Sequence, residues 1–206
     1  MTMSPVLADA AVDVVFPIEG QTLPRDYAQA LQQAMSEKLS WLDADPVAGI
    51  HPIKVVQGND DQALLSRRTS LLLRVGAGRA DELLALAKLD LSVGGHLLRL
   101  SRPHLRELLA HTTLYAYRVA AESADELTFM AAVERELAEW SIGGERVCGK
   151  RQRMMVSGRV LDTFSLMLHS LPPEQSLRLQ QHGLGSYRLL GCGIFVPHRS
   201  AAAVGS

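Results

Sequence analysis

Apolar positions change their period repeatedly along the first hundred residues. Residues 11–17 form a short apolar run that Pro17 closes, which predicts a buried strand. Downstream of Pro24, apolar side chains recur at spacings of three, four and seven, so an amphipathic helix is expected over residues 24–42. Four further elements are predicted: strands at 50–56 and 70–75, a short helix at 79–88, and a strand or strand pair at 89–100 that bends at Gly94-Gly95. Pro52 assigns the strand at 50–56 to a sheet edge.

The second hundred residues repeat this order without repeating the sequence. A strand is predicted at 114–121, and Ser123 to Glu126 form a capping box at the start of an amphipathic helix. The remaining elements are a basic strand or hairpin at 146–156, a strand at 164–171, a helix from Pro172-Pro173, and a last strand at 194–196. Both halves read β-α-β-β-α-β, the ferredoxin-like order. The sequence therefore predicts an α+β protein of two tandem ferredoxin-like domains, residues 1–103 and 104–206, with the crossing at 101–107.

Residues 183–193 carry four glycines in two Gly-apolar-Gly units, with Arg188 between them. Bare backbone N–H groups beside a guanidinium can hold a phosphate, either of a metabolite or of a polymer. The spacing is neither the dinucleotide fingerprint nor a P-loop. The glycines could equally permit a bulge or tight packing before the last strand.

Charge separates the last third of the chain from the rest. The net charge is -1, yet residues 143–206 hold eight Lys/Arg against three Asp/Glu. Five of these bases lie within residues 146–159, which indicates a polyanion partner or, alternatively, a solvated basic hairpin. The only cysteines, Cys148 and Cys192, fit neither a disulfide framework nor a metal site, so no metal or other cofactor and a reducing cytoplasm are expected. No apolar run is long enough for a membrane span and no signal peptide is visible, so no membrane partner is expected.

Several segments together resemble one known family, over roughly residues 11–204. The tandem pattern, the basic hairpin and the glycine-rich loop before the last strand resemble the repeat-RNA endoribonucleases of CRISPR systems, the sixth CRISPR-associated (Cas) protein family. Four stretches are similar to its Myxan-type branch in particular: Gly49–Val55, Arg146–Gln152, Phe164–His169 and Gly191–His198.

The resemblance implies both a fold and an activity. It implies the RAMP-type fold, in which a glycine-rich loop precedes the last strand. The implied activity is metal-independent cleavage of CRISPR repeat RNA (pre-crRNA) to guide RNAs. The 2′-hydroxyl attacks the scissile phosphate and leaves 2′,3′-cyclic phosphate and 5′-hydroxyl ends. Members commonly stay bound to the product crRNA and join other CRISPR-associated subunits in an interference complex.

Cleavage of this kind needs proton transfer near neutral pH, for which histidine is suited. We assign the catalytic role to His51, at the mouth of the second strand, with Lys54 three residues later. Several branches of the family carry this histidine on or just after the first helix, but residues 24–42 contain none. His51 could instead be a partly buried structural residue. The expected RNA-binding residues are Lys54, Arg67, Arg68, Arg146, Lys150, Arg151, Arg153, Gly183, Gly185, Tyr187, Arg188, Gly191 and Gly193.

Two other functions fit the same sequence. The first is a catalytically inactive subunit that binds repeat RNA, which the histidine-free first helix favours. The second is an unrelated ferredoxin-like enzyme that acts on a phosphate-containing metabolite; the basic hairpin and the missing nucleotide motif count against it.

Overall fold

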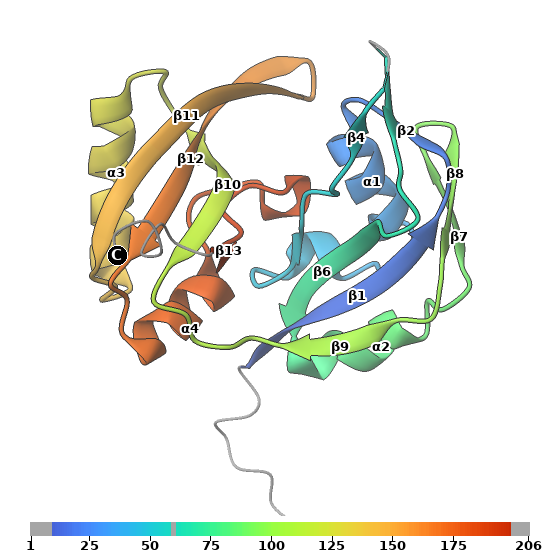
Figure 1. Ribbon diagram of the computed structural model, residues 1–206, viewed down its shortest axis with the longest axis horizontal. Coiled ribbons are helices and arrows are strands. Elements are labelled where there is room, and N and C mark those ends of the chain that lie inside the picture. Colours follow the sequence, from blue (N-terminus) through green and yellow to red (C-terminus); the bar gives the residue numbers. More distant parts are fainter. Residues whose placement is uncertain (1–9, 59–60, 199–206) are drawn as a thin grey trace, which may run out of the picture. The chain divides into compact units, whose positions relative to one another are not determined.

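The computed structural model describes residues 10–58 and 61–198, and its chain divides into two compact units (Figure 1). Unit 1 ends at Leu108 and also contains Leu189–Gly191, whereas unit 2 begins at Leu109 and contains the rest. The boundary therefore lies after the predicted one at 103/104. The reason is that strand β9 (His104–Glu107), beyond the predicted boundary, pairs with the first strand of unit 1.

Unit 1 is built on an antiparallel sheet with the order β3-β6-β1-β8-β7, and β9 also pairs with β1. Its helices are α1 (Tyr27–Ser36) and α2 (Ala80–Leu84). The strands of this sheet are β1 (Ala11–Glu19), β3 (Gly49–Ile50), β6 (Ser70–Gly76), β7 (Asp90–Val93) and β8 (His96–Leu100). The order places β1 between β6 and β8, as a ferredoxin-like unit requires, and the hairpin at Gly94-Gly95 is confirmed.

The predicted strand at 50–56 is mostly absent. Only β3 joins the main sheet, and it does so at the edge, as Pro52 predicted. The chain then leaves the ladder because Pro52 has no N–H to donate and the N–H of Ile53 bonds to the hydroxyl of Tyr27 instead, at 2.7 Å. It returns as β4 (Val56–Gln57) in a small sheet of order β2-β5-β4, with β2 (Thr22–Pro24) and β5 (Gln62–Leu64).

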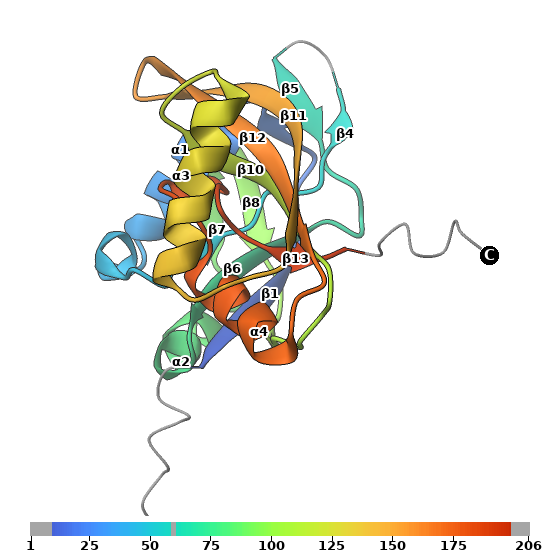
Figure 2. The same ribbon diagram turned by 90° about the vertical axis from the view of Figure 1, so that its left-hand side faces the viewer.

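Unit 2 has one sheet with the order β11-β12-β10-β13. Its strands are β10 (Leu114–Ala121), β11 (Glu145–Val156), β12 (Arg159–His169) and β13 (Val196–Pro197), and its helices are α3 (Glu126–Glu139) and α4 (Pro173–His182). Helix α3 runs along one face of the sheet (Figures 1 and 2), where Phe129 stacks on Phe164 with ring centroids 4.7 Å apart. Leu179 of α4 packs into the same core. Each unit thus has its own hydrophobic core, and the tandem ferredoxin-like prediction is confirmed.

Local signals at the helix ends were partly right. Pro173 occupies the first turn of α4, as predicted. Helix α3 is capped by Asp125 rather than Ser123: the Asp125 carboxylate accepts the N–H of Thr128 at 2.8 Å, and Ser123 Oγ accepts the N–H of Asp125. A short acidic side chain has the same capping ability as serine, so the helix begins later than expected. None of the helices within residues 10–58 and 61–198 combines the length and apolarity that a membrane span needs.

Candidate functional site

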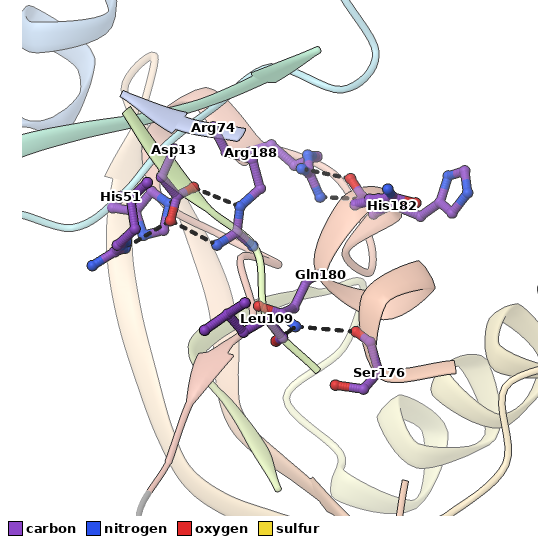
Figure 3. A network of polar contacts seen from close by, with 10 residues as sticks. Asp13, His51, Arg74, Leu109, Ser176, Gln180, His182 and Arg188 are labelled. Carbon is purple, nitrogen blue, oxygen red and sulfur yellow. Dashed lines mark hydrogen bonds and ion pairs between the residues drawn. The ribbon is translucent and has the colours of Figure 1, made fainter. Parts of the chain in front are cut away.

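Unit 1 contains a buried cluster of charges centred on Asp13 (Figure 3). The strand registers place Asp13 opposite Arg74 of β6 on one side and opposite Arg106 of β9 on the other. Its Oδ1 lies 2.8 Å from Arg74 Nε, and its Oδ2 lies 3.2 Å from Arg74 Nη2 and 2.7 Å from Arg106 Nη2. Asp13 and Arg74 are almost free of solvent, at 1% and 0% exposure. A buried carboxylate is tolerated only when its charge is paired in this way.

His51 is the third partner of this carboxylate. Its backbone N–H donates to the carbonyl of Leu72 at 2.9 Å, which continues the β3–β6 ladder by one bond. Its ring Nε2 lies 3.2 Å from Asp13 Oδ1, and the residue is 6% exposed. The site therefore assembles His51, Asp13 and Arg74 from three segments that are far apart in the sequence.

Electrostatics fixes the protonation state of both groups near neutral pH. Burial alone would raise the pKa of Asp13, but hydrogen bonds from His51 and Arg74 hold it far below its ordinary 3.8. Burial lowers the pKa of His51 below 6.5, Asp13 opposes this, and Arg74 and Arg106 add to it. Near pH 7 the imidazole is thus neutral. Its Nε2–H donates to Asp13, and the lone pair is left on Nδ1.

The loop after His51 is held by Tyr27 of α1. The Tyr27 hydroxyl accepts the N–H of Ile53 at 2.7 Å and lies 3.2 Å from the carbonyl of the same residue. Lys54 follows and is exposed, as are Arg67 and Arg68 in the turn before β6. Within the described residues these three cations form no ion pair.

The hairpin of β11 and β12 is less cationic than its sequence indicated. Asp162 lies 2.8 Å from Arg151 Nη2 and 3.6 Å from Arg153 Nε, so one carboxylate serves two predicted RNA-binding residues. Arg146 lies 3.6 Å from a carboxylate oxygen of Glu134. Lys150 is exposed, and no described carboxylate pairs with it. This free lysine lies at a β-bulge, where the register shifts between Cys148 and Arg151.

The glycine-rich loop is closed by its own backbone within unit 2. The N–H of Leu184 donates to the carbonyl of Gly193 at 3.2 Å, and the N–H of Gly193 donates to the carbonyl of Arg118 at 2.7 Å. Gly183 and Gly193 both have positive φ, of 68° and 65°. A Cβ on Gly193 would collide with the carbonyl of Leu184, and one on Gly183 would collide with the carbonyl of Gly193. Packing therefore suffices to explain both glycines.

The expected anion-binding groups of this loop already have partners inside the chain. The Arg188 guanidinium donates to the carbonyls of His182 and Gln181 and so caps the last turn of α4 (Figure 3). The N–H of Gly185 donates to both carboxylate oxygens of Glu136, at 2.8 and 3.1 Å. The loop thus does bind an anion, but that anion is a side chain of α3.

The other two predicted residues of the loop differ in surroundings. Tyr187 is 44% exposed and has a φ of 65°, the left-handed region that a non-glycine residue seldom adopts. Gly191 is counted with unit 1, where a Cβ would lie 3.0 Å from Pro52, the residue after His51. The structure therefore brings Gly191 next to the segment that carries the candidate catalytic histidine.

Sequence reasoning selected His51 as a candidate but did not select its partners. Asp13 and Arg74 were passed over because they lie inside apolar strand runs. That position was the available signal, since a charge within a buried strand needs a partner. Nothing in the sequence pattern indicated Arg106, because only the pairing of β9 with β1 brings it to Asp13. No group of three or more His, Cys, Asp or Glu side chains in the described part of the chain could hold a metal ion.

Comparison with known proteins identifies the family to which this chain belongs. Residues 12–200 match the sequence model of the Cas6 family, described as "Cas6 Crispr". The chain is 34% identical over 196 residues to the CRISPR-associated endonuclease Cas6 of Myxococcus xanthus (strain DK1622), covering 95% of this chain and 85% of that protein. The chain belongs to the Cas6 family of CRISPR-associated proteins.

Solved structures share the fold at low sequence identity. A CRISPR-associated Cas6 protein aligns with a TM-score of 0.69 and 8% identity, covering 92% of this chain and all of the other (100%). A Cas6-related protein from Pyrococcus furiosus aligns with a TM-score of 0.63 and 12% identity, covering 90% and 98%. A RAMP protein that binds different RNA substrates gives a TM-score of 0.61 at 14% identity, covering 90% and 98%. The RAMP-type fold expected from the sequence is therefore confirmed.

Proposed function

We propose that this protein is a metal-independent endoribonuclease that cleaves CRISPR repeat RNA into guide RNAs. The observation that carries the proposal is the match to the Myxococcus xanthus endonuclease over nearly the whole chain. The free cations of both units, among them Lys54 and Lys150, supply the charge that an RNA backbone requires. Cleavage takes place in the cytoplasm, where repeat transcripts are made.

His51 acts as the general base in this proposal. Its neutral imidazole takes the proton of the 2′-hydroxyl at Nδ1 while Nε2–H stays bonded to Asp13. The 2′-oxygen then attacks the adjacent phosphorus, the bond to the 5′-oxygen breaks, and the leaving oxygen takes up a proton from water. The products are a 2′,3′-cyclic phosphate and a 5′-hydroxyl. Asp13 stabilises the imidazolium that forms, and Lys54 neutralises charge on the phosphorane.

The RNA-binding surface in this proposal comprises the predicted cations and the glycine-rich loop. Lys54, Arg67 and Arg68 bind the phosphates nearest the scissile bond. The β11–β12 hairpin follows the RNA backbone further away, because RNA helices are read largely by shape and phosphate contacts. Glu136 marks the anion position at Gly185, which a phosphate oxygen takes when RNA is bound. The protein stays on the product and joins other CRISPR-associated subunits.

A catalytically inactive repeat-RNA-binding subunit is the second candidate function. The burial of His51 favours it, since only 7% of its side-chain surface is accessible and Nε2 is committed to Asp13. In that case His51 serves only to neutralise the charge cluster. The surfaces that bind RNA stay the same, but cleavage is absent.

One assay separates the two candidates. Repeat RNA from the same genome is incubated with the protein in EDTA, and the wild type is compared with His51→Ala and with His104→Ala, an exposed histidine of β9 that serves as the control. Cleavage to a cyclic-phosphate product that His51→Ala loses and His104→Ala keeps is the expected result. Tight binding of intact RNA by all three proteins would instead establish the binding subunit. Absence of both binding and cleavage would contradict both functions.

A further inference from the structure

The sheet of unit 2 has one face that its helices do not cover. Leu114 and Ala116 of β10 point into the core with α3 and α4, so Tyr115 between them points to the opposite face, where its ring contacts that of Tyr117. Tyr117 is 54% exposed there. We call this surface the open face and define it by Tyr115, Tyr117, Met167, Val147 and His198.

Aromatic rings on the open face form a continuous series. The rings of Tyr115 and Tyr117 meet edge to face, with centroids 5.1 Å apart at 77°. Tyr115 also contacts the ring of His198, at 5.3 Å and 47°. The register extends this series across the sheet, since Tyr115 lies opposite Met167 and Met167 lies opposite Val147. Flat apolar surface therefore crosses three strands and the end of β13.

A β-bulge positions the exposed end of this surface. The register between β10 and β12 shifts between Ala116 and Val119, which leaves Tyr117 and Arg118 unpaired in the ladder. Gln152 of β11 fastens the bulge: its Nε2 donates to the carbonyl of Tyr117 at 2.9 Å, and its Oε1 accepts Arg118 Nε at 3.2 Å. An exposed ring and a guanidinium are thus held next to each other by one amide.

The charges around the open face favour an anionic ligand with flat apolar groups. In the described part of unit 2, no carboxylate pairs with Arg118. Glu145, which lies opposite His169 in the β11–β12 register, has its carboxylate 3.8 Å from His169 Nε2 and 3.4 Å from Ser170 Oγ. The open face offers few charges with which a protein partner could form ion pairs. A nucleotide, in contrast, could stack its base on a tyrosine ring and place its phosphate near Arg118. Four-stranded sheets with exposed aromatic side chains stack unpaired RNA bases in just this way.

We propose that the open face binds a single-stranded segment of RNA by stacking its bases on Tyr117 and Tyr115, with Arg118 at a phosphate. The inference rests on the proposed function insofar as RNA is the ligand, but it names a site separate from His51. Single-stranded RNA is required, because bases within a duplex do not offer their faces to a side chain. The segment that flanks the cleaved or folded part of a repeat has this chemistry.

The test measures the affinity of the intact protein for a labelled, unstructured oligoribonucleotide by fluorescence anisotropy over a range of salt concentrations. We expect Tyr117→Ala to weaken binding roughly 5- to 100-fold, which corresponds to one stacked base, without changing the salt slope. Tyr117→Phe keeps the ring and should bind within about twofold of the wild type. Leu127→Ala removes an even more exposed apolar side chain, 81% accessible, from α3 on the covered side, and should have no effect.

Tyr117→Trp provides a second measurement that does not depend on a loss of binding. The larger ring should bind RNA at least as tightly as the wild type, and RNA should quench the indole fluorescence of Y117W. Unchanged affinity of Tyr117→Ala together with unquenched Y117W would overturn the inference. Sedimentation that shows a dimer of this chain in the wild type and a monomer in Tyr117→Ala would also overturn the inference, because a second copy of the chain would then cover the open face. Cleavage of repeat RNA is measured in parallel. If Tyr117→Ala binds RNA as tightly as the wild type and the protein cleaves repeat RNA, only the open-face site is contradicted and the proposed function stands.

Discussion

Asp13 and Arg74 face each other across neighbouring strands β1 and β6, with Arg74 Nε 2.8 Å from Asp13 Oδ1 and neither residue more than 1% exposed. Such a pair is costly to desolvate and more costly to break, because removal of one partner leaves the other charged and unpaired. The same carboxylate also orients His51. Loss of this one ion pair would therefore destabilise unit 1, and its carboxylate also sets the tautomer of the candidate catalytic residue.

The two arginines on Asp13 should contribute unequally to stability. We expect Arg74→Leu to lower the free energy of unfolding by about 3–5 kcal/mol, because it leaves the buried carboxylate with only the half-exposed Arg106 and the neutral His51 as partners. Arg106→Ala should cost about 1 kcal/mol or less, since half of the Arg106 side chain is solvent-exposed and Arg74 still pairs with Asp13. Denaturant unfolding of the two variants measures the difference. Equal losses would contradict a cluster centred on Arg74.

Stability should fall when the pH drops below about 6.5. The pKa of His51 is lower in the folded protein than its ordinary value, so the unfolded chain takes up the proton first and acid favours unfolding. Asp13 acts in the same direction at lower pH, because its folded pKa lies below 3.8. We expect a loss of at most about 1.4 kcal/mol per pH unit from His51, measured by denaturant unfolding at pH 7.5 and 5.5.

Variants assign this pH dependence to one residue. His51→Gln should flatten the change between the two pH values. The pKa of His182 is also lowered, by partial burial and then by Arg188 and Arg178, but its side chain is exposed. His182→Gln should therefore leave most of the pH dependence in place. A larger effect of His182→Gln would locate the titration in unit 2 instead.

Two glycines with similar backbone angles should respond differently to alanine. Gly193 has a φ of 65° and no room for a Cβ beside Leu184, whereas Gly158 in the hairpin turn has a φ of 77° and open space around it. Gly158→Ala should cost about 1 kcal/mol, from backbone strain alone. Gly193→Ala should cost at least twice as much. Thermal unfolding of both variants distinguishes a packing requirement from a conformational one.

Asp162 should restrain RNA binding by the hairpin. It neutralises Arg151 and Arg153, so Asp162→Asn should tighten RNA binding and steepen its salt dependence. Lys150→Gln should weaken binding and reduce the salt slope by about 1, as expected for one phosphate contact. Filter binding at several salt concentrations measures both, with Lys38→Gln, in the turn after α1, as the control. An unchanged slope in Asp162→Asn would show that the hairpin does not contact the RNA backbone.

Local sequence signals predicted much of the architecture because they act over short distances. The apolar runs at 11–17 and 70–75, the proline that opens α4 and the Gly94-Gly95 turn each specify their own element, and the structure has all of them. The strand expected at 50–56 failed because the residues around Pro52 hydrogen-bond to Tyr27 rather than to a neighbouring strand. The family resemblance of the glycine-rich loop was also visible in the chain alone.

The sequence by itself determined the two β-α-β-β-α-β units, their apolar cores and the family to which the chain belongs, since periodicity and short motifs are local properties. Only the tertiary structure decided which charges act together. The strand register pairs Asp13 with Arg74 and Arg106, and the β11–β12 hairpin brings Asp162 into an ion pair with Arg151. Arg188 donates hydrogen bonds to carbonyls at the end of α4. Partners this distant along the chain are chosen by packing and burial, because a charge removed from water must find its counterpart in space.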